Sequence, residues 1–294
     1  MNLLCPRCHC LLEKQSFCLD CDFNYKLPGF EIPVLIDWDK SILNVGDINF
    51  DMNYKPVPRS NEKLRQIIKR SFRPNVFKRP TEKEDFLQRV NYPKKVLIIG
   101  SGTIGHGMKW LYEMSDIDVL GLDIYYTDTV DLIADAHNIP VESNNFDLVI
   151  IQAVLEHVLS PIIVVNEIYR VLKPEGFVYS ETPFLQAVHE GPFDFTRYTH
   201  SGHRFLFKDF SETDSGVIQG VSTSLIWAIS SFVLGLTRSK RFSKIITFIL
   251  LPITYMDLLI PFKYHIIGGN GFYFLGRKTA QVLSAKSMVK YFKG

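Results

Sequence analysis

Three consecutive stretches decide the fold of this 294-residue chain. They are VLIIGSGTIGHG at 96–107, VLGLDIYY at 119–126 and IADAHNIPVESNNFDLVIIQAVLEHV at 133–158. The first apolar run ends in a glycine-rich loop, the second ends at an acid, and the third ends in an Ala-Asp-Ala turn. This series predicts parallel strands whose carboxyl ends together hold a nucleotide-type cofactor.

Strands and helices alternate from Lys94 onward, which predicts an α/β, doubly wound, Rossmann-like sheet at 94–278. We expect seven strands, near 95–100, 118–123, 131–135, 147–152, 176–181, 217–222 and 271–277. Helices are expected near 105–115, 160–173 and 201–210.

The glycine loop and the acid after the second strand have separate predicted roles. Gly100, Gly102 and Gly105 let the backbone approach a ligand closely, and the amides of a following helix would face it. Asp123 ends its strand at the carboxyl edge, where a carboxylate accepts hydrogen bonds from both ribose hydroxyls. This much fits NAD and S-adenosylmethionine equally.

The third stretch favours S-adenosylmethionine. Asp135 is predicted to accept from the adenine amino group, and Ala136 to offer its amide to a ring nitrogen. Ile124 would cover one face of the adenine. FDLVIIQAVLEHV then supplies a buried strand and a loop holding Gln152, Glu156 and His157.

With these residues, 94–182 resembles the methyltransferase type 11 family, which includes ubiquinone and menaquinone methyltransferases. The later IYRVLKPEGFVYSETP is also typical of that family. The resemblance implies a class I methyltransferase fold in which Gly100, Ser101, Gly102 and Gly105 flank the methionine part of the cofactor. It implies ribose binding by Asp123, adenine binding by Asp135 and Ala136, and a site floor at Gln152. The chain departs from the family at Ile98, where an acid is usual.

The segment 181–207 is the expected acceptor side. It looks like a segment of methyltransferases from bacterial surface-glycan clusters, which combines His189, Pro192, Asp194, Arg197 and Tyr198. His189 would take the proton of an attacking hydroxyl, Asp194 would orient that imidazole, and Arg197 would clamp a carboxylate or phosphate. The alternative is that Asp194 and Arg197 only form an ion pair that fixes the loop.

The other histidines of this region receive structural predictions. His157 is expected to be a structural residue near the cofactor, with a catalytic role as the alternative. His200 and His203 are expected at the start of a helix and on its surface.

Residues 1–37 predict a zinc ribbon. CPRC at 5–8 and CLDC at 18–21 place Cys5, Cys8, Cys18 and Cys21 as ligands of one closed, structural Zn²⁺. The alternative is four unrelated buried cysteines, and Cys10 is a spare thiol. The stretch resembles the small zinc-ribbon proteins that activate tRNA and protein methyltransferases. Cysteines this early in the chain, with no apolar signal segment, predict a reducing, cytoplasmic location.

Residues 38–93 are interpreted as a basic helical connector, with a helix over 61–72 capped by Ser60. Lysine and arginine outnumber acids between 55 and 95, thirteen to four. A solvated helical face is the first interpretation, and contact with nucleic acid or lipid phosphates is the second.

The apolar residues 223–264 would form an insertion between the last two strands, as lid helices packed on the sheet. Four cations at 238–244 leave open an interfacial hairpin on anionic lipid, peripheral to the inner face of the membrane. Pro252 and Asp257 argue against a membrane span. The tail 279–294 is expected to contain a helix.

The sequence therefore predicts a methyltransferase that uses S-adenosyl-L-methionine, with O-methylation of a glycan, lipid-linked or other small-molecule acceptor. An rRNA or tRNA methyltransferase is the second hypothesis, although the chain lacks an evident base-gripping motif, which disfavours nucleic acid. A non-catalytic adaptor is the third hypothesis. An NAD-dependent oxidoreductase is the fourth, disfavoured by the Ala-Asp-Ala element.

Overall fold

The structure is a computed structural model that describes residues 2–12, 17–24, 32–44, 77–189, 191–280 and 282–294. The helix predicted over 61–72 and most of the basic connector lie outside the described residues.

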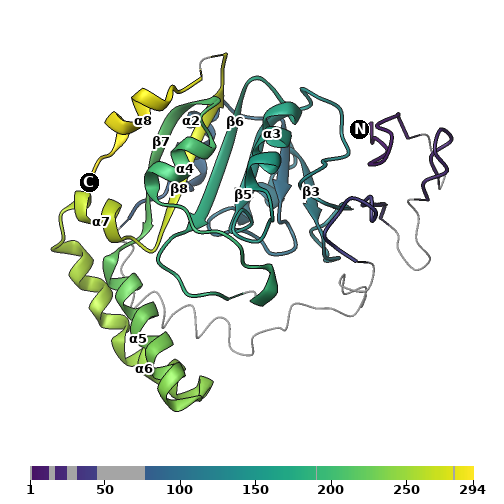
Figure 1. Ribbon diagram of the computed structural model, residues 1–294. Helices are drawn as coiled ribbons and strands as arrows, with labels where there is room; N and C mark the ends of the chain where they lie inside the picture. The colour runs from purple at the N-terminus through teal and green to yellow at the C-terminus, as the bar shows by residue number, and fades with distance from the viewer. Residues whose placement is uncertain (1, 13–16, 25–31, 45–76, 190, 281) are drawn as a thin grey trace.

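One eight-stranded mixed sheet organises the chain (Figure 1). Its spatial order is β1-β4-β3-β2-β5-β6-β8-β7, and β8 runs antiparallel to both of its neighbours. The strands are β1 (Val34–Leu35), β2 (Lys95–Ile99), β3 (Asp118–Asp123), β4 (Leu132–Ala134), β5 (Phe146–Gln152), β6 (Leu172–Pro183), β7 (Phe210–Gln219) and β8 (Gly271–Lys278). From β2 the chain first adds β3 and β4 on one side and then β5 and β6 on the other side. The carboxyl ends of the adjacent parallel strands β2 and β5 therefore flank the topological switch point.

Alternate residues of the buried strands face two separate apolar layers. Leu97 and Ile99 of β2 pack with α3 (Pro161–Val171) on one face. Val96 and Ile98 pack with α2 (Lys83–Arg89) on the other face. Because a central parallel strand is covered on both sides, its sequence is continuously apolar.

The predicted helix over 105–115 is wrong. The chain makes turns as far as Met108, and only a short 3₁₀ helix, η1 (Lys109–Glu113), follows. Gly107 has a φ of +79°, and this left-handed conformation interrupts a right-handed helix. The other predicted helices are present as α3 and α4 (His200–Leu206).

The sixth predicted strand begins earlier than the predicted 217–222. The observed β7 begins at Phe210 and is an edge strand that pairs with β8 alone. Its first half, FSETDS, is polar because one edge of the strand meets solvent, so it lacks the apolar signal used for the central strands.

The described N-terminal residues attach to the sheet at the end opposite β7. β1 pairs in parallel with β4 and adds an eighth strand to the seven predicted. An isolated bridge joins Leu3 to Val141, and Cys5 and Cys18 are buried in the same apolar cluster as Ala136. The N-terminal segment is thus packed against the loop that follows β4.

The predicted insertion forms α5 (Val221–Thr237), α6 (Lys240–Leu250), the 3₁₀ helix η3 (Leu251–Leu258) and α7 (Phe262–Gly268). α5 and α6 form a hairpin that projects away from the sheet (Figure 1). Only residues near the start of α5 are buried, and α6 has no buried residue, so these helices are not the lid packed on the sheet that we expected. Among the described residues, no helix is both long and apolar enough to cross a membrane. The tail contains α8 (Ala285–Tyr291).

Candidate active site

A cavity of about 830 Å³ opens at the carboxyl ends of β2, β3, β4 and β5. Nearly all residues predicted to bind a cofactor line it. They are Gly100, Gly102, Gly105, Asp123, Ile124, Asp135, Ala136 and Gln152. Parallel topology brings these residues together because every strand of this group ends at the same edge.

The glycine loop leaves no room for side chains at two positions. A Cβ on Gly102 would lie 2.8 Å from Oδ2 of Asp123, and a Cβ on Gly105 would collide with Oε1 of Gln152. Gly100 has a φ of +80° as the chain leaves β2. The loop therefore presents bare backbone to the cavity, as an approach by a nucleotide-type ligand requires.

Asp123 joins the second strand to this loop. Its Oδ2 accepts from the amide of Gly102 at 2.8 Å, and its Oδ1 accepts from the amides of Ile124 and Tyr125 at 2.7 and 3.1 Å. Burial raises the pKa of Asp123, although these three bonds act in the opposite direction. A carboxylate oxygen has two lone pairs, so Oδ2 retains one acceptor site for a ribose hydroxyl.

Asp135 is held from both sides. Its Oδ1 accepts from Nδ1 and the amide of His137 at 2.6 and 2.9 Å, and its Oδ2 accepts from the hydroxyl of Ser41 at 2.5 Å. Burial acts to raise the pKa of Asp135, but the bonds from His137 and Ser41 outweigh it and the pKa is lowered. Nε2 of His137 accepts from the amide of Ser160 at 3.1 Å, and Nδ1 donates to Asp135.

Several cavity residues escaped the sequence analysis. Ile42 and Leu43 reach the cavity from the segment after β1, which the sequence places far from the glycine loop. Glu181 lines the cavity and is paired with Arg79 at 3.2 Å. His137 was detectable, since it lies two positions after Asp135 in the same turn.

The side chains of Ser101 and Ile98 do not line the cavity. Ser101 is fully buried and its hydroxyl lies under Gly121, so the side chain does not line the cavity and only its backbone can flank a ligand. Ile98 packs in the apolar layer beneath α2. Because the side chain at position 98 lies outside the cavity, the replacement of the usual acid by Ile98 leaves no gap in the described cavity wall.

The segment 181–207, the expected acceptor side and here called the acceptor loop, meets the cavity at His189. The amide of His189 donates to Oδ2 of Asp194 at 2.9 Å, and Nδ1 of His189 lies 3.4 Å from that same oxygen. The Arg197 guanidinium holds the pKa of the Asp194 carboxyl well below its usual range. Asp194 is therefore an ionised carboxylate beside the imidazole that was predicted to act as the base.

Arg197 uses all five of its N–H donors inside the loop. Nη1 and Nη2 donate to the two carboxylate oxygens of Asp194, and the remaining bonds go to the carbonyls of Gln186, Ala187 and Thr196. In this arrangement Arg197 has no donor for an acceptor, and it does not line the cavity. For Arg197 the geometry is that of the alternative, an ion pair that fixes the loop, while Asp194 also lies beside His189.

His157 lines the cavity beside His189, with ring centroids 5.1 Å apart. Its Nδ1 donates to the carbonyl of Phe193 at 2.8 Å, and its Nε2 lies 3.8 Å from Oε1 of Glu156. Burial raises the pKa of Glu156 to about 7. Glu156 is 1 % exposed, so the acid that the sequence placed in this loop without a role is buried.

The predicted surface position of His200 and His203 is wrong. Both side chains are buried, and burial lowers their pKa values to about 4 and about 3. His203 lies 2.9 Å from the hydroxyl of Ser180 on β6. α4 begins at His200 as expected, but its histidines face the sheet as neutral structural residues.

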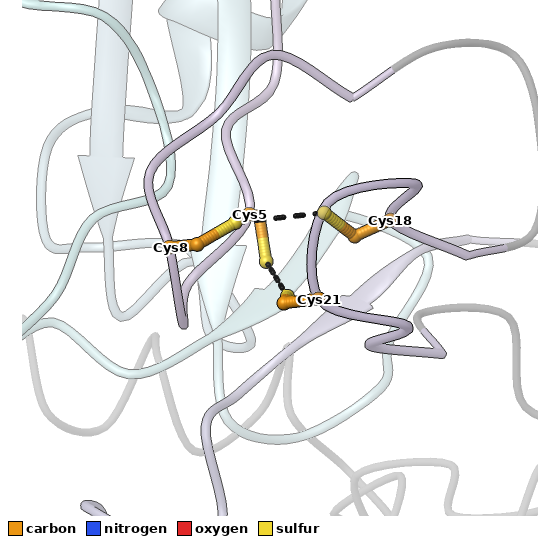
Figure 2. Close-up of side chains that lie close together, drawn as sticks. All are labelled: Cys5, Cys8, Cys18 and Cys21. Carbon is orange, nitrogen blue, oxygen red and sulfur yellow. Dashed lines mark hydrogen bonds between the residues drawn. The ribbon is translucent and has the colours of Figure 1, made fainter.

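The N-terminal cysteines converge from two loops (Figure 2). The sulfurs of Cys5, Cys8, Cys18 and Cys21 lie within 4.8 Å of one another, with 3.5 Å between Cys5 and Cys21 and between Cys8 and Cys18. Four convergent thiolates fit the tetrahedral ligand set of a structural zinc ion. Cys10 lies 3.0 Å from Cys18, so the spare thiol borders the same cluster.

Comparison with known proteins agrees with this architecture. Residues 97–180 match the sequence model of a methyltransferase domain family, type 11. No sequence among the curated proteins matches the chain significantly. The chain is similar to an S-adenosylmethionine-dependent methyltransferase from Archaeoglobus fulgidus at 14% identity, covering 66% of this chain and 90% of that chain with a TM-score of 0.44. A second similar structure, from Methanosarcina mazei, is 13% identical, covering 65% and 93% of the two chains with a TM-score of 0.37.

The family match covers the strands and loops that build the cavity, and the sheet carries the late antiparallel strand of class I methyltransferases. At TM-scores below 0.5 the structural neighbours add nothing to this conclusion. The protein is a class I S-adenosylmethionine-dependent methyltransferase. Within that class, residues 97–180 carry the type 11 methyltransferase domain.

Proposed function

We propose that this methyltransferase transfers the methyl group to an oxygen of a glycan, lipid-linked or other small-molecule acceptor. The observation that carries the proposal is the pair His189–Asp194 at the edge of the cavity. An imidazole beside an ionised carboxylate is the arrangement of a general base for a hydroxyl.

In the proposed binding mode, Asp123 accepts from the ribose, and the glycine loop lies along the methionine part of S-adenosylmethionine. Ile124, Ala136 and Leu43 enclose the adenine, and Asp135 orients the loop beneath it. The residues fit because Gly102 and Gly105 leave backbone where any side chain would meet Asp123 or Gln152. When bound, the cofactor supplies an activated methyl group on its sulfonium.

The chemistry left to the protein is then small. His189 accepts the proton of the attacking hydroxyl, Asp194 orients and stabilises the imidazolium, and the cavity holds the two reactants in line. Arg197 holds Asp194 in place. The N-terminal zinc ion, held by Cys5, Cys8, Cys18 and Cys21, is proposed as structural and takes no part in the transfer.

Calorimetry tests the cofactor assignment. S-adenosylhomocysteine should bind the purified protein, NAD should not, and Asp123→Ala should lower the affinity for S-adenosylhomocysteine by about tenfold or more, because a charge-assisted hydrogen bond from the ribose to Oδ2 is lost. Intact binding by Asp123→Ala would contradict the ribose assignment.

Methyl transfer to a panel of glycans and lipid-linked sugars tests the acceptor class. His189→Ala should abolish transfer and leave S-adenosylhomocysteine affinity unchanged, whereas His157→Gln should retain part of the rate. Transfer to structured RNA with steep salt dependence would instead favour a nucleic-acid substrate.

A further inference from the structure

We infer that the hairpin of α5 and α6, with η3, is a surface that binds an anionic lipid bilayer and lies in its interface. The occupant is the membrane itself, as the composition, burial and charge of residues 221–262 indicate. The inference does not depend on the identity of the acceptor.

The outer surface of the hairpin is apolar. Its exposed large side chains are Phe232, Leu234, Leu236, Phe242, Ile245, Phe248, Ile249, Tyr255, Met256, Leu258 and Leu259, with Leu259 81% exposed. Scattered exposed apolar residues are ordinary, but a contiguous set on one projecting element marks an interaction surface.

The inner seam of the hairpin is polar. The hydroxyls of Ser230 and Thr247 lie 2.6 Å apart between the two helices, and the hydroxyl of Ser243 donates to the carbonyl of Ser230 at 2.9 Å. A hairpin made for water places its apolar side chains in the seam and its polar ones outside. In this hairpin the polar side chains lie in the seam and the apolar side chains lie outside, as in helices surrounded by lipid.

Charge selects a negatively charged bilayer as the occupant. Residues 221–262 contain the cations Arg238, Lys240, Arg241 and Lys244, all exposed at the turn and the start of α6. The single acid, Asp257, is buried and accepts from the amide of Ser222. The exposed surface therefore combines apolar side chains with cations and carries no anion, which is the composition of an interfacial anchor on anionic lipid.

The length of the helices places them in the interface. α5 has 17 residues and is about 26 Å long at 1.5 Å per residue, short of the roughly 30 Å of a hydrocarbon core. α6 has 11 residues and begins with two cations. Neither helix spans a bilayer, so the pair rests within one leaflet.

The hairpin is joined to the catalytic cavity. Trp227, on the second turn of α5, lies beside His189 with ring centroids 6.3 Å apart. The first two turns of α5, where the hairpin leaves the protein body, are therefore next to His189, the predicted base. A lipid-linked acceptor held at the bilayer surface would reach the cavity by this route.

Vesicle flotation of the full-length protein tests the inference. The protein should float with phosphatidylcholine vesicles containing about a third phosphatidylglycerol and much less with pure phosphatidylcholine, since the cations require anionic lipid. Phe242→Glu with Ile249→Glu should reduce the bound fraction by about tenfold or more. Neutralising the four cations to Gln should remove the preference for phosphatidylglycerol.

Matched controls keep the result specific. Ile162→Glu changes an equally exposed apolar residue on α3 and should leave flotation unchanged. Each variant should retain wild-type affinity for S-adenosylhomocysteine, which shows that it is folded and separates failure here from failure of the proposed function. Absence of flotation with anionic vesicles would overturn the inference. A lipid-free dimer that Phe242→Glu converts to a monomer would also overturn it and assign the surface to a second copy.

Discussion

The hydroxyl of Ser41 donates to Oδ2 of Asp135 at 2.5 Å, across 94 positions of sequence. Ser41 belongs to the segment that follows β1, and Asp135 directly follows β4 beside the predicted adenine site. The neighbours Ile42 and Leu43 line the same cavity. The N-terminal segment is thus part of the wall of the cofactor site.

Ser41→Ala should weaken cofactor binding. The change removes a bond to a carboxylate and should lower affinity for S-adenosylhomocysteine by about threefold to tenfold, corresponding to roughly 1 kcal/mol. Calorimetry measures the change. Ser143→Ala, in an exposed turn, is the control and should bind as the wild type does. Equal affinities for all three proteins would show that the Ser41 bond has no part in binding.

Removal of the predicted zinc ion should have a larger effect on the same site. Cys5 and Cys18 are buried with Ala136, and the amide of Leu4 donates to the carbonyl of Pro140 at 2.9 Å. Without the metal this packing loosens, so chelation should lower both the melting temperature and the cofactor affinity. Zinc should restore both. A Cys18→Ser, Cys21→Ser double variant that still binds one zinc ion would contradict the ligand assignment.

Gly105→Ala should damage the site without unfolding the protein. The added methyl group collides with the end of the Gln152 side chain, which must then leave the carbonyl of His106. Affinity for S-adenosylhomocysteine should fall by about tenfold, because the side chain moves into the ligand's space. Gly235→Ala is the matched control, since its new methyl group meets open space. The two variants should differ in binding and resemble each other in melting temperature.

Glu156 should make stability depend on pH. Its pKa is raised from the ordinary 4.5 to about 7 by burial, so the folded state binds a proton that the unfolded state releases in this range. Stability is therefore lost as pH rises from 4.5 to 7, by about 3 kcal/mol, and does not fall further above pH 7. Urea unfolding of the wild type and Glu156→Gln at several pH values measures the difference. A difference between the two proteins that stays constant with pH would refute the raised pKa.

Arg197→Ala should destabilise the acceptor loop. The substitution leaves Asp194, whose side chain is 1% exposed, without its counter-ion, and should cost about 3 kcal/mol. Arg277→Ala removes an exposed partner of Glu175 and should cost less than about 1 kcal/mol. Arg197→Lys should recover only part of the loss, because lysine cannot form the paired bonds to Asp194. Denaturant unfolding compares the three variants.

The central strands were predictable because both of their faces are buried. β2, β3 and β5 contain the apolar runs VLII, VLGL and LVII, and these runs are followed at the carboxyl edge by Gly100, Asp123 and Gln152. β7 was misplaced because an edge strand carries polar residues. The helix predicted after the glycine loop is absent because Gly107 takes a positive φ, which apolar periodicity does not reveal.

The sequence by itself determined the class of the protein, through Gly100, Gly102, Asp123 and Asp135, because strand ends and turn residues are local signals. Only the tertiary structure decided what completes the site. It brought Ser41 and Leu43 to the cavity, turned Arg197 inward onto Asp194, and buried His200 and His203. The positions of Ser41, Leu43, His200 and His203 depend on contacts between segments distant in sequence, where packing and desolvation, not local preference, set the position of a side chain.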